Sequence, residues 1–371
     1  VLARLVTRSI GMVSTLILAR VLVPEDFGLV AMATSLVALI ELLRAFGFDT
    51  ALIQNQQADR RHYDTAWTFN VALGFLAGVL VASLAVPATW FYDEVRILPV
   101  MLVLAVGIVV QGVENVGIVD FRKHLQFDRD FWFMLGQKLA GFLATVPLAL
   151  YLRSYWALVI GILVTRLWAV ASSYYMHPYR PRLSLAAYAE LISFSKWLLL
   201  NNFLTFLRSR ASDFVIGRLQ GPRAVGLFNV SYEIANLPAS EIVMPINRAV
   251  YSGYAIMGSD RPRLRDGFLN VISVIAAFAV PAGVGLAAVA QGLVPLALGA
   301  NWLDAVPIVQ ILSVYGVLVA LQTNALYVYI AVGEPRTAAL LNSLYVAILI
   351  PALLLGATSA GPVGAAWACL I

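Results

Sequence analysis

The sequence predicts an all-α polytopic membrane protein, and its composition, its hydropathy and its length each support this fold class. Of 371 residues, 61% are hydrophobic and 12% are charged, whereas roughly 25% are charged in an average soluble domain. Mean hydropathy is +0.84, and no apolar run alternates like a membrane β-strand. A helical span with its loop takes roughly 30 residues, so the length corresponds to about 12 spans.

Apolar runs, separated by Pro, Gly and charged residues, place these spans along the chain. They are expected at residues 1–22, 28–48, 66–87, 97–118, 132–152, 155–176, 191–217, 225–248, 268–290, 305–331 and 336–356, with a last one from 362. Aromatic residues gather near their ends, as expected for rings at the headgroup level. Because the chain starts without Met and stops inside an apolar run, we expect that it lacks its first residues and part of its last spans.

Lysine and arginine are distributed unequally between alternate loops, which predicts the orientation. Eleven lie on one side: Arg60, Arg61, Arg122, Lys123, Arg129, Arg180, Arg182, Arg261, Arg263, Arg265 and Arg336. Three lie on the other: Arg96, Arg153 and Arg223. Basic residues favour cytoplasmic loops, so the N-terminus is predicted to be cytoplasmic. The net charge of +5 reflects this bias, and we expect no nucleic-acid partner. The single cysteine, Cys369, excludes a disulfide framework, and no metal site is expected.

A short motif recurs 198 residues along the chain. Arg20–Leu29 and Arg218–Leu227 both read R-x3-P-x3-G-L, at the helix–turn–helix that opens each half of the chain. Six predicted spans lie between the two copies, so the halves have the same orientation and an axis along the membrane normal relates them. We therefore predict two pseudo-symmetric six-helix lobes, at 1–177 and 191–371, with the last helix truncated and residues 178–190 as a cytoplasmic linker.

Charged residues within the predicted spans are the main candidates for function. Eleven basic and five acidic residues lie in or at the ends of spans, and each charge near the bilayer centre costs at least about 2.5–3.5 kcal/mol. Two polar stripes share a spacing of four, three and four residues: Arg4, Arg8, Gly11 and Thr15 in the first span, and Asn201, Thr205, Arg208 and Ser212 in the seventh. Each stripe occupies one helix face, so both lobes are predicted to present a polar face to one cavity.

The candidate site residues follow from this argument. The predicted cationic cavity consists of Arg4, Arg8, Arg44, Lys138, Arg166, Arg208 and Arg248. Further polar residues of the cavity are Thr15, Gln111, Asn115, Asn201, Thr205 and Ser212. The carboxylates that could couple transport to H⁺ or Na⁺ are Glu41, Asp213, Glu233 and Glu241. A structural alternative stays open, because Glu41 with Arg44, and Arg210 with Asp213, are spaced to neutralise each other on one helix. Pro238 and Pro245 are predicted to break or kink the eighth span.

The excess of basic residues predicts an anionic substrate, since the arginine fork binds two phosphate oxygens at once. No phosphate-binding loop, metalloprotease motif or nucleophile-elbow motif is present, and no loop exceeds roughly 20 residues. A transporter without cofactors is therefore expected rather than an enzyme.

Three stretches resemble a known family. Ala19–Ala33, Phe194–Asn202 and Arg210–Pro238 are similar to bacterial polysaccharide and lipopolysaccharide flippases of the colanic-acid and teichuronic-acid exporter type. These belong to the superfamily of multidrug, oligosaccharidyl-lipid and polysaccharide exporters. The resemblance implies two six-helix bundles that form a V-shaped alternating-access transporter in the bacterial inner membrane.

The resemblance also implies a substrate: an undecaprenyl-pyrophosphate-linked oligosaccharide, moved from the inner to the outer leaflet for surface polysaccharide biosynthesis. Partners would be this lipid-linked oligosaccharide, the bilayer, and a polymerase with its export machinery. Two alternatives stay open: a cation-coupled multidrug exporter of the same superfamily, and a membrane enzyme of polysaccharide assembly. The basic excess in the spans disfavours the former, because cationic drugs call for an acidic cavity, and the short loops disfavour the latter.

Overall fold

The computed structural model describes residues 2–42, 48–188, 196–258 and 260–370, and within them the side chains of all but 2–5, 196–201, 242, 248 and 335. Every regular element in these ranges is helical, which confirms the all-α prediction. The chain divides into two compact units, Val1–Phe206 and Leu207–Ile371, which we call the N-terminal and the C-terminal lobe.

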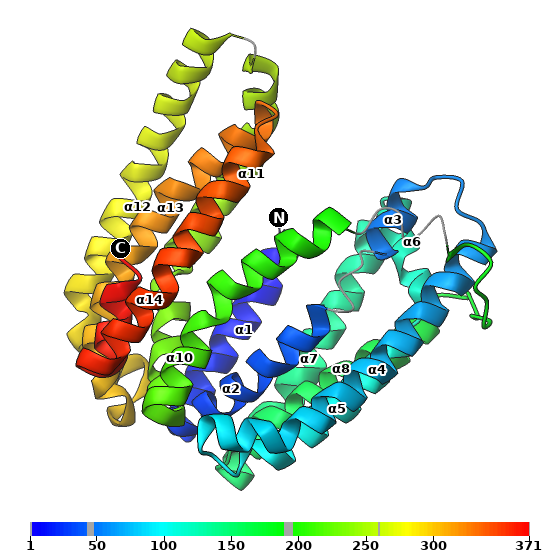
Figure 1. Ribbon diagram of the computed structural model, residues 1–371, viewed down its shortest axis with the longest axis horizontal. Helices are drawn as coiled ribbons and strands as arrows, with labels where there is room; N and C mark the ends of the chain where they lie inside the picture. The colour runs from blue at the N-terminus through cyan, green and yellow to red at the C-terminus, as the bar shows by residue number, and fades with distance from the viewer. Residues whose placement is uncertain (1, 43–47, 189–195, 259, 371) are drawn as a thin grey trace. The chain divides into compact units, whose positions relative to one another are not determined.

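The N-terminal lobe is a bundle of long helices with short ones at one end (Figure 1). Helix α1 packs against α7, α2 against α5, and α5 against both α4 and α8, while α7 pairs with α8. Buried leucines and alanines such as Leu18, Leu22, Ala149 and Ala157 fill one part of its core. Its helices are α1 (Leu2–Val21), α2 (Pro24–Glu41), α3 (Phe48–Gln54), α4 (Arg60–Tyr92), α5 (Ile97–Gly112), η2 (Val116–Ile118), α6 (Val119–Lys123), α7 (Phe127–Leu152) and α8 (Trp156–Met176).

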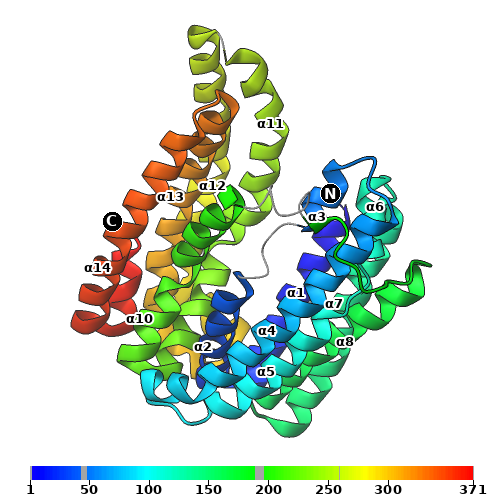
Figure 2. The same cartoon turned by 45° about the vertical axis from the view of Figure 1, so that its right-hand side comes forward.

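The C-terminal lobe is also a bundle of long helices. Helix α13 packs against α11, α12 and α14, and Figure 2 shows α13 alongside α12 and α14. Helix α10 crosses the boundary between the two units. The elements are α10 (Lys196–Ala235), the π-helix η3 (Ala239–Val243), α11 (Met244–Met257), α12 (Arg261–Leu298), η4 (Ala300–Ala305), α13 (Val306–Ala331) and α14 (Pro335–Ala368).

Both copies of the sequence repeat form a helix–turn–helix. In the first copy α1 ends at Val21 and Pro24 opens α2. In the second, the helical path of α10 is interrupted at Gly221, whose φ is +76°, and continues from Pro222. Proline suits the first turn of a helix because it has no N–H to donate, and glycine reaches positive φ without steric cost. The repeat therefore marks equivalent corners of the two halves.

Two further breaks agree with the predicted spans. The π-helix Ala239–Val243 lies between Pro238 and Pro245 and separates α10 from α11, so the predicted break of the eighth span is confirmed. Helix α14 leaves helical geometry at Ala360 and Gly361, between the predicted eleventh and twelfth spans.

Six described helices are long and apolar enough to cross a bilayer, or seven if the bent pair Ile97–Gly112 and Val116–Lys123 is one span. The protein is thus a multi-pass membrane protein. Helix α2, in contrast, carries the three carboxylates Glu25, Asp26 and Glu41 within 18 residues. Charged side chains on such a helix must face protein or water, because their exposure to lipid costs free energy.

Candidate functional site

Two polar cavities lie inside the N-terminal lobe. The larger has a volume of about 510 Å³ and is lined by residues of α1, α3, α5, α6, α7 and α8. The smaller, of about 340 Å³, lies beside the end of α5. Asp49, Gln111, Glu114 and Ile118 line both cavities, so the two share a wall and form one polar region.

Arg166 of α8 is held at the wall of the larger cavity by a charged partner. Its Nη2 donates to Glu41 Oε1 of α2 at 2.9 Å, and the two side chains are 16% and 32% exposed. Its Nη1 is buried and has no hydrogen-bond partner among the described residues. A Cβ on Gly107 would lie 3.1 Å from Arg166 Cδ, so this glycine leaves the space that the arginine occupies. A buried guanidinium nitrogen without a partner is ready to donate to an anion.

Two more basic residues line the same cavity. Lys138 of α7 is exposed and forms no ion pair within the described part of the chain. Arg122 of α6 is half-exposed, and its Nε lies 3.0 Å from Asp130 Oδ1. The larger cavity is therefore lined by three basic side chains, of which Lys138 is the least neutralised, and also by the carboxylates of Asp49 and Glu114.

A bend of 68° between α5 and the η2–α6 segment shapes the shared wall. Asn115 holds this bend. Its Oδ1 accepts from the Gly117 N–H at 2.9 Å, its Nδ2 donates to the Tyr179 carbonyl at 2.8 Å, and its own N–H donates to Ser173 Oγ at 3.0 Å. Asn115 is fully buried, so its amide stabilises the bend that positions Gln111 and Glu114.

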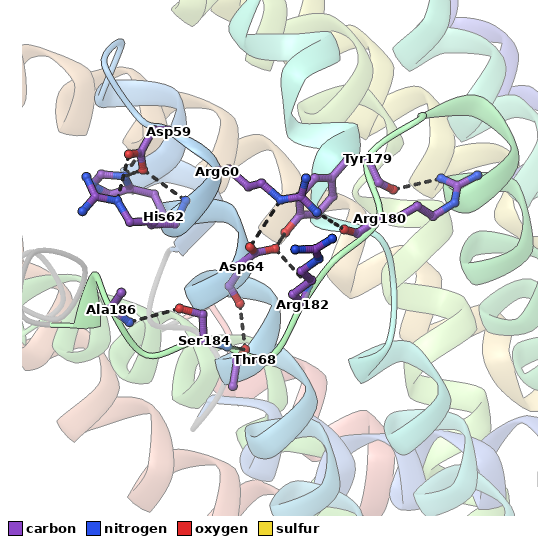
Figure 3. A network of polar contacts seen from close by, with 11 residues as sticks. Asp59, Arg60, His62, Asp64, Thr68, Tyr179, Arg180, Arg182, Ser184 and Ala186 are labelled. Carbon is purple, nitrogen blue, oxygen red and sulfur yellow. Dashed lines mark hydrogen bonds and ion pairs between the residues drawn. The ribbon is translucent and has the colours of Figure 1, made fainter.

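The chain after α8 docks on α4, as Figure 3 shows. We call residues 177–188 the strap. Asp64 Oδ1 of α4 accepts from the Tyr179 hydroxyl at 2.5 Å and from the Arg182 N–H at 2.9 Å. Thr68 Oγ1 accepts from the Ser184 N–H at 3.0 Å. Thr68 shares a helix face with both Asp64 and Thr65, because it lies four residues after the first and three after the second.

Further contacts tie the strap down at both ends. The Ala187 N–H donates to Thr65 Oγ1 at 3.2 Å, and Arg60 donates to the Arg180 carbonyl at 3.2 Å. Residues 178–188 of the predicted linker thus belong structurally to the N-terminal lobe. Residues 189–195, the remainder of the linker and the start of the next span, lie outside the described residues.

Several groups at this end have shifted pKa values. Burial, and next the hydrogen bond to Asp64, raises the pKa of Tyr179. The Tyr63 hydroxyl donates to Asp120. Burial lowers the pKa of His177, although its Nε2 lies 3.3 Å from Asp120 Oδ2. Phenols and imidazole are therefore held neutral, and the carboxylates accept their hydrogen bonds.

The C-terminal lobe contains two small pockets that share Arg208. One, of about 30 Å³, is lined by Arg208, Ser212, Asn229, Tyr232, Tyr315, Tyr345 and neighbours on α10, α13 and α14. The other, of about 70 Å³, lies between Arg208 and polar residues of α13 and α14, including Gln322, Tyr329 and Asn342. Arg208 takes part in no ion pair among the described residues, and no carboxylate lines either pocket.

Asp213 is the most deeply buried carboxylate among the candidates, with its side chain 1% exposed. Its Oδ2 lies 3.2 Å from Arg210 Nη1, and its Oδ1 accepts from Asn229 Nδ2 at 2.8 Å. The structural pairing of Arg210 with Asp213 expected from their spacing is present. Because Asn229 also lines the Arg208 pocket, Asp213 is one hydrogen bond away from that pocket.

The structure brings together one group of the predicted site residues in each lobe. Lys138, Arg166, Gln111 and Asn115 line the N-terminal cavities, with Glu41 joined through Arg166. Arg208 and Ser212 line the C-terminal pocket. Arg8, Thr15 and Thr205 are half-buried or exposed on their helices and line none of these cavities, and the same holds for Glu233 and for Glu241, which accepts from Ser240 at 2.8 Å.

The structure does not describe the side chains of four candidate site residues. Arg44 lies outside the described residues, as do the side chains of Arg4, Asn201 and Arg248. Glu41 pairs with Arg166 of a distant helix, and its predicted partner Arg44 lies in an undescribed range.

Sequence reasoning missed neutral groups of both lobes. Gln137 and Thr165 line the larger cavity, and Tyr232, Tyr315 and Tyr345 line the Arg208 pocket. A buried amide cluster in the C-terminal lobe was also missed, in which Tyr254 donates to Asn324 and Asn324 donates to Asn247 at 2.7 Å. Tyrosine and threonine are ordinary in membrane helices, so only asparagine within apolar runs, as at Asn247 and Asn324, offered a signal.

Comparison with known proteins places this architecture. The chain is 26% identical to the lipopolysaccharide biosynthesis protein WzxC of Escherichia coli (strain K12), over 98% of this chain and 75% of that protein. Its fold matches the lipid II flippase MurJ in an inward closed conformation, with a TM-score of 0.76, 14% identity and coverage of 99% and 83%. It also matches an inward-facing MATE family transporter of the MOP superfamily, with a TM-score of 0.74, 15% identity and coverage of 98% and 90%.

The fold is therefore that of alternating-access transporters, as predicted. Residues 17–307 match the profile of a single protein family, described as polysaccharide biosynthesis protein. This match spans most of the chain and includes both helix–turn–helix repeats. The chain belongs to the polysaccharide biosynthesis protein family.

Proposed function

We propose that this protein is a flippase that moves undecaprenyl-pyrophosphate-linked oligosaccharide from the inner to the outer leaflet of the bacterial cytoplasmic membrane. Its product would supply surface polysaccharide biosynthesis, where a polymerase and export machinery act next. The family membership and the likeness to MurJ and WzxC support this proposal. The N-terminus is proposed to be cytoplasmic, because the basic residues of alternate loops favour that side.

The observation that carries the proposal is the polar cavity of about 510 Å³ with Lys138 and Arg166 on its wall. A cavity of this size accommodates a polar headgroup of several rings, within the range of ligand sites in proteins. Lys138 supplies a cation without a partner among the described residues, and Arg166 Nη1 supplies a buried donor. Charge-assisted hydrogen bonds of this kind suit phosphate oxygens.

The cavity contains mainly neutral donors and acceptors besides these charges. Gln111, Gln137 and Thr165 offer amides and a hydroxyl of the type that bind sugar hydroxyls. The headgroup would enter this region while the lipid tail stays in the bilayer. A conformational change of the lobes would then expose the headgroup to the other side of the membrane.

The test is transport in proteoliposomes. The purified protein is reconstituted with NBD-labelled undecaprenyl-pyrophosphate-linked oligosaccharide, and its transbilayer movement is followed by dithionite bleaching. Replacing Lys138 and Arg166 by Ala is expected to slow flipping at least about tenfold, because each lost hydrogen bond to a charged group is worth about 1.5–3 kcal/mol. Arg153→Ala, an exposed arginine at the end of α7 outside the cavities, is the matched control.

A second variant tests the C-terminal lobe. Replacement of Arg208 and Arg248 by Ala is expected to abolish flipping while membrane insertion stays normal. Wild-type flipping rates in both double variants would contradict the proposal. Efflux of a cationic dye without any movement of the labelled lipid would identify a multidrug exporter instead. Formation of longer glycans by the purified protein would identify an enzyme.

Coupling to H⁺ or Na⁺ is part of the proposal, with Asp213 as the coupling residue. Its carboxylate is buried next to Arg210 and linked through Asn229 to the Arg208 pocket. Ionisable residues in membrane helices mark ion pathways. Among the described residues, no group of three or more His, Cys, Asp or Glu could hold a metal ion. Dependence of flipping on a pH or Na⁺ gradient, lost in Asp213→Asn, is the expected result.

A further inference from the structure

The two cavities of the N-terminal lobe differ in the charges that line them. Asp49 and Glu114 are the charged residues at the smaller cavity of about 340 Å³, and no described lysine or arginine lines it. The larger cavity shares these two carboxylates and adds Arg122, Lys138 and Arg166. We call the larger cavity the basic compartment and the smaller one the acidic compartment. A ligand that occupies both must therefore combine an anionic part with a part that tolerates negative charge around it.

Three segments of the lobe bring the polar lining of the acidic compartment together. Asp49 lies in the first turn of α3, Asn70 lies on α4, and Gln111 lies near the end of α5. The Glu114 N–H donates to the Gln111 carbonyl at 3.2 Å, so these two residues belong to one turn. The side-chain amide of Asn115 is engaged in the bend that follows, and its role is to position this turn.

Neutral surface completes the lining of the acidic compartment. Asn70 and Gln111 are half-buried, and each amide offers two N–H donors and a carbonyl acceptor. Phe48, Val116 and Val119 line the same cavity and belong to one buried apolar cluster. Amides, carboxylates and apolar surface thus lie around one small space.

This combination suits a pyranose sugar, which has hydroxyls around apolar C–H faces. Its hydroxyls donate to carboxylates through charge-assisted hydrogen bonds, and they exchange hydrogen bonds with amides. Phosphate oxygens and the carboxylate of a uronic acid are instead repelled by Asp49 and Glu114. A volume of about 340 Å³ lies at the lower end of the range for ligand sites, which suits one sugar rather than a whole oligosaccharide.

The place of each part of the ligand follows from these charges. Lys138 and Arg166 line the basic compartment and not the acidic one, so the pyrophosphate belongs beside them. The first sugar is bonded directly to the pyrophosphate, and it is therefore the part of the glycan that reaches the adjoining compartment. Asp49 and Glu114 line both compartments, so they lie where a negative charge on this sugar would be most unfavourable.

We propose that the acidic compartment is the subsite for the sugar bonded to the pyrophosphate, and that Asp49 and Glu114 select an uncharged sugar there over a uronic acid. Hydroxyls of the sugar donate to the two carboxylates, and Asn70 and Gln111 bind further hydroxyls. This assignment rests on the proposed function and adds to it the class of sugar that the site accepts. Pyrophosphate and first sugar both bind within the N-terminal lobe.

The test compares three lipids that differ only at the first sugar. Purified protein in detergent is titrated, by native mass spectrometry, with undecaprenyl pyrophosphate, with undecaprenyl-pyrophosphoryl glucose and with undecaprenyl-pyrophosphoryl glucuronic acid. The unmodified protein is expected to bind the glucose lipid more tightly than the sugar-free carrier. It is expected to bind the glucose lipid at least about tenfold more tightly than the glucuronic acid lipid, because the two carboxylates repel the uronate.

Substitution of the carboxylates tests their role in this preference. Asp49→Asn/Glu114→Gln removes both charges at nearly unchanged size, so the ratio of the two sugar-lipid affinities is expected to fall below about threefold. The ratio is the readout because a general gain in phosphate affinity affects all three lipids equally. Asn70→Ala is expected to weaken the glucose lipid roughly twofold to tenfold relative to the sugar-free carrier, through lost hydrogen bonds.

The matched control is Asp128→Asn. Asp128 is exposed in the first turn of α7 and lines neither compartment, so this variant should keep the ratio of the unmodified protein. If the double variant does not fold, Asp49→Asn alone carries the test, since Asp49 is exposed. Equal binding of the two sugar lipids by the unmodified protein, a preference for the glucuronic acid lipid, or a ratio that the substitutions leave unchanged would overturn the sugar subsite. Failure of the unmodified protein to bind any of the three lipids would overturn the proposed function itself.

Discussion

The two lobes share a repeated corner but differ in how their interiors satisfy polar groups. The N-terminal lobe uses charge: Arg166 pairs with Glu41, and the carboxylates of Asp64 and Asp120 accept from tyrosines. The C-terminal lobe relies largely on neutral amides and phenols, as in the buried cluster around Asn324 and in the hydrogen bond between the hydroxyls of Tyr315 and Tyr345. The comparison teaches that the helix–turn–helix repeat specifies the architecture and leaves the chemistry of each interior free to diverge.

The ion pair of Arg210 and Asp213 is the point where the C-terminal lobe most resembles the other lobe, and breaking it should have the largest effect. Arg210→Ala leaves the 1% exposed carboxylate of Asp213 without the guanidinium that faces it. Loss of one partner of a buried pair costs about 3–5 kcal/mol, and because Arg210 is 38% exposed we expect roughly 2–3 kcal/mol. Thermal unfolding in detergent measures the change.

A second substitution makes this prediction specific. Adding Asp213→Asn to Arg210→Ala removes the buried charge and keeps a side-chain partner for Asn229, so most of the stability should return. If the single and the double variant are equally unstable, the charge is not the cause, and the contrast between the lobes is smaller than we propose.

The amide cluster tests the neutral interior. Asn324→Leu removes the acceptor of the Tyr254 hydroxyl and the donor to Asn247, which are all fully buried. Buried polar groups left without partners cost about 1–3 kcal/mol, so we expect a loss of about 2 kcal/mol in the free energy of unfolding. Because no charge is involved, the loss should be the same at low and high salt, unlike that in Arg210→Ala. A salt-dependent loss would argue against a neutral network.

The strap tests whether the linker belongs to the N-terminal lobe. Asp64→Ala removes the acceptor of the Tyr179 hydroxyl and of the Arg182 N–H. If the substitution lowers the free energy of local opening by about 1.4 kcal/mol, the opened state is about ten times more populated and cleavage is about tenfold faster. Trypsin cleavage after Arg182 should therefore accelerate by that factor, whereas cleavage after Arg263, on the other lobe, should not change. The bonds after Arg180 and Arg261 are not cut, because a proline follows each of them. Equal acceleration at both places would indicate global unfolding instead of strap release.

The smallest expected effect is a pH dependence at His177, which lies just after α8. Burial lowers its pKa below 6.5, with Asp120, Arg129 and Arg180 as the charged neighbours. The unfolded chain then binds more protons at acid pH, so the stabilisation that is present above pH 6.5 is lost as pH falls through the lower folded pKa. Between pH 7.5 and 5.5, His177→Gln should lose less stability than the unmodified protein. A steeper loss of stability in His177→Gln than in the unmodified protein would contradict this prediction.

Sequence patterns predicted much of this protein because membrane folding is governed by local rules. Apolar runs must form helices, since backbone groups in lipid have to be paired internally. Proline and glycine set the corners at Pro24, Gly221 and Gly361. The repeat and the cost of charge in spans also directed attention to Arg166 and Arg208, which the structure places on cavity walls.

Tertiary structure alone decided which of these side chains share a site. Spacing along one helix suggested Arg44 as a partner for Glu41, and Arg44 lies outside the described residues. The folded chain brings Arg166 to Glu41 from 125 residues away, which no spacing along one helix could indicate. The pocket beside Arg208 is lined by Tyr232, Tyr315 and Tyr345 of three helices, and none of these tyrosines stands out in the sequence. The strap, read from its prolines and arginines as a linker, docks through backbone N–H groups that every residue has. Periodicity reports what one helix presents, whereas a site depends on which helices pack together, and that is determined by side-chain packing across the bundle.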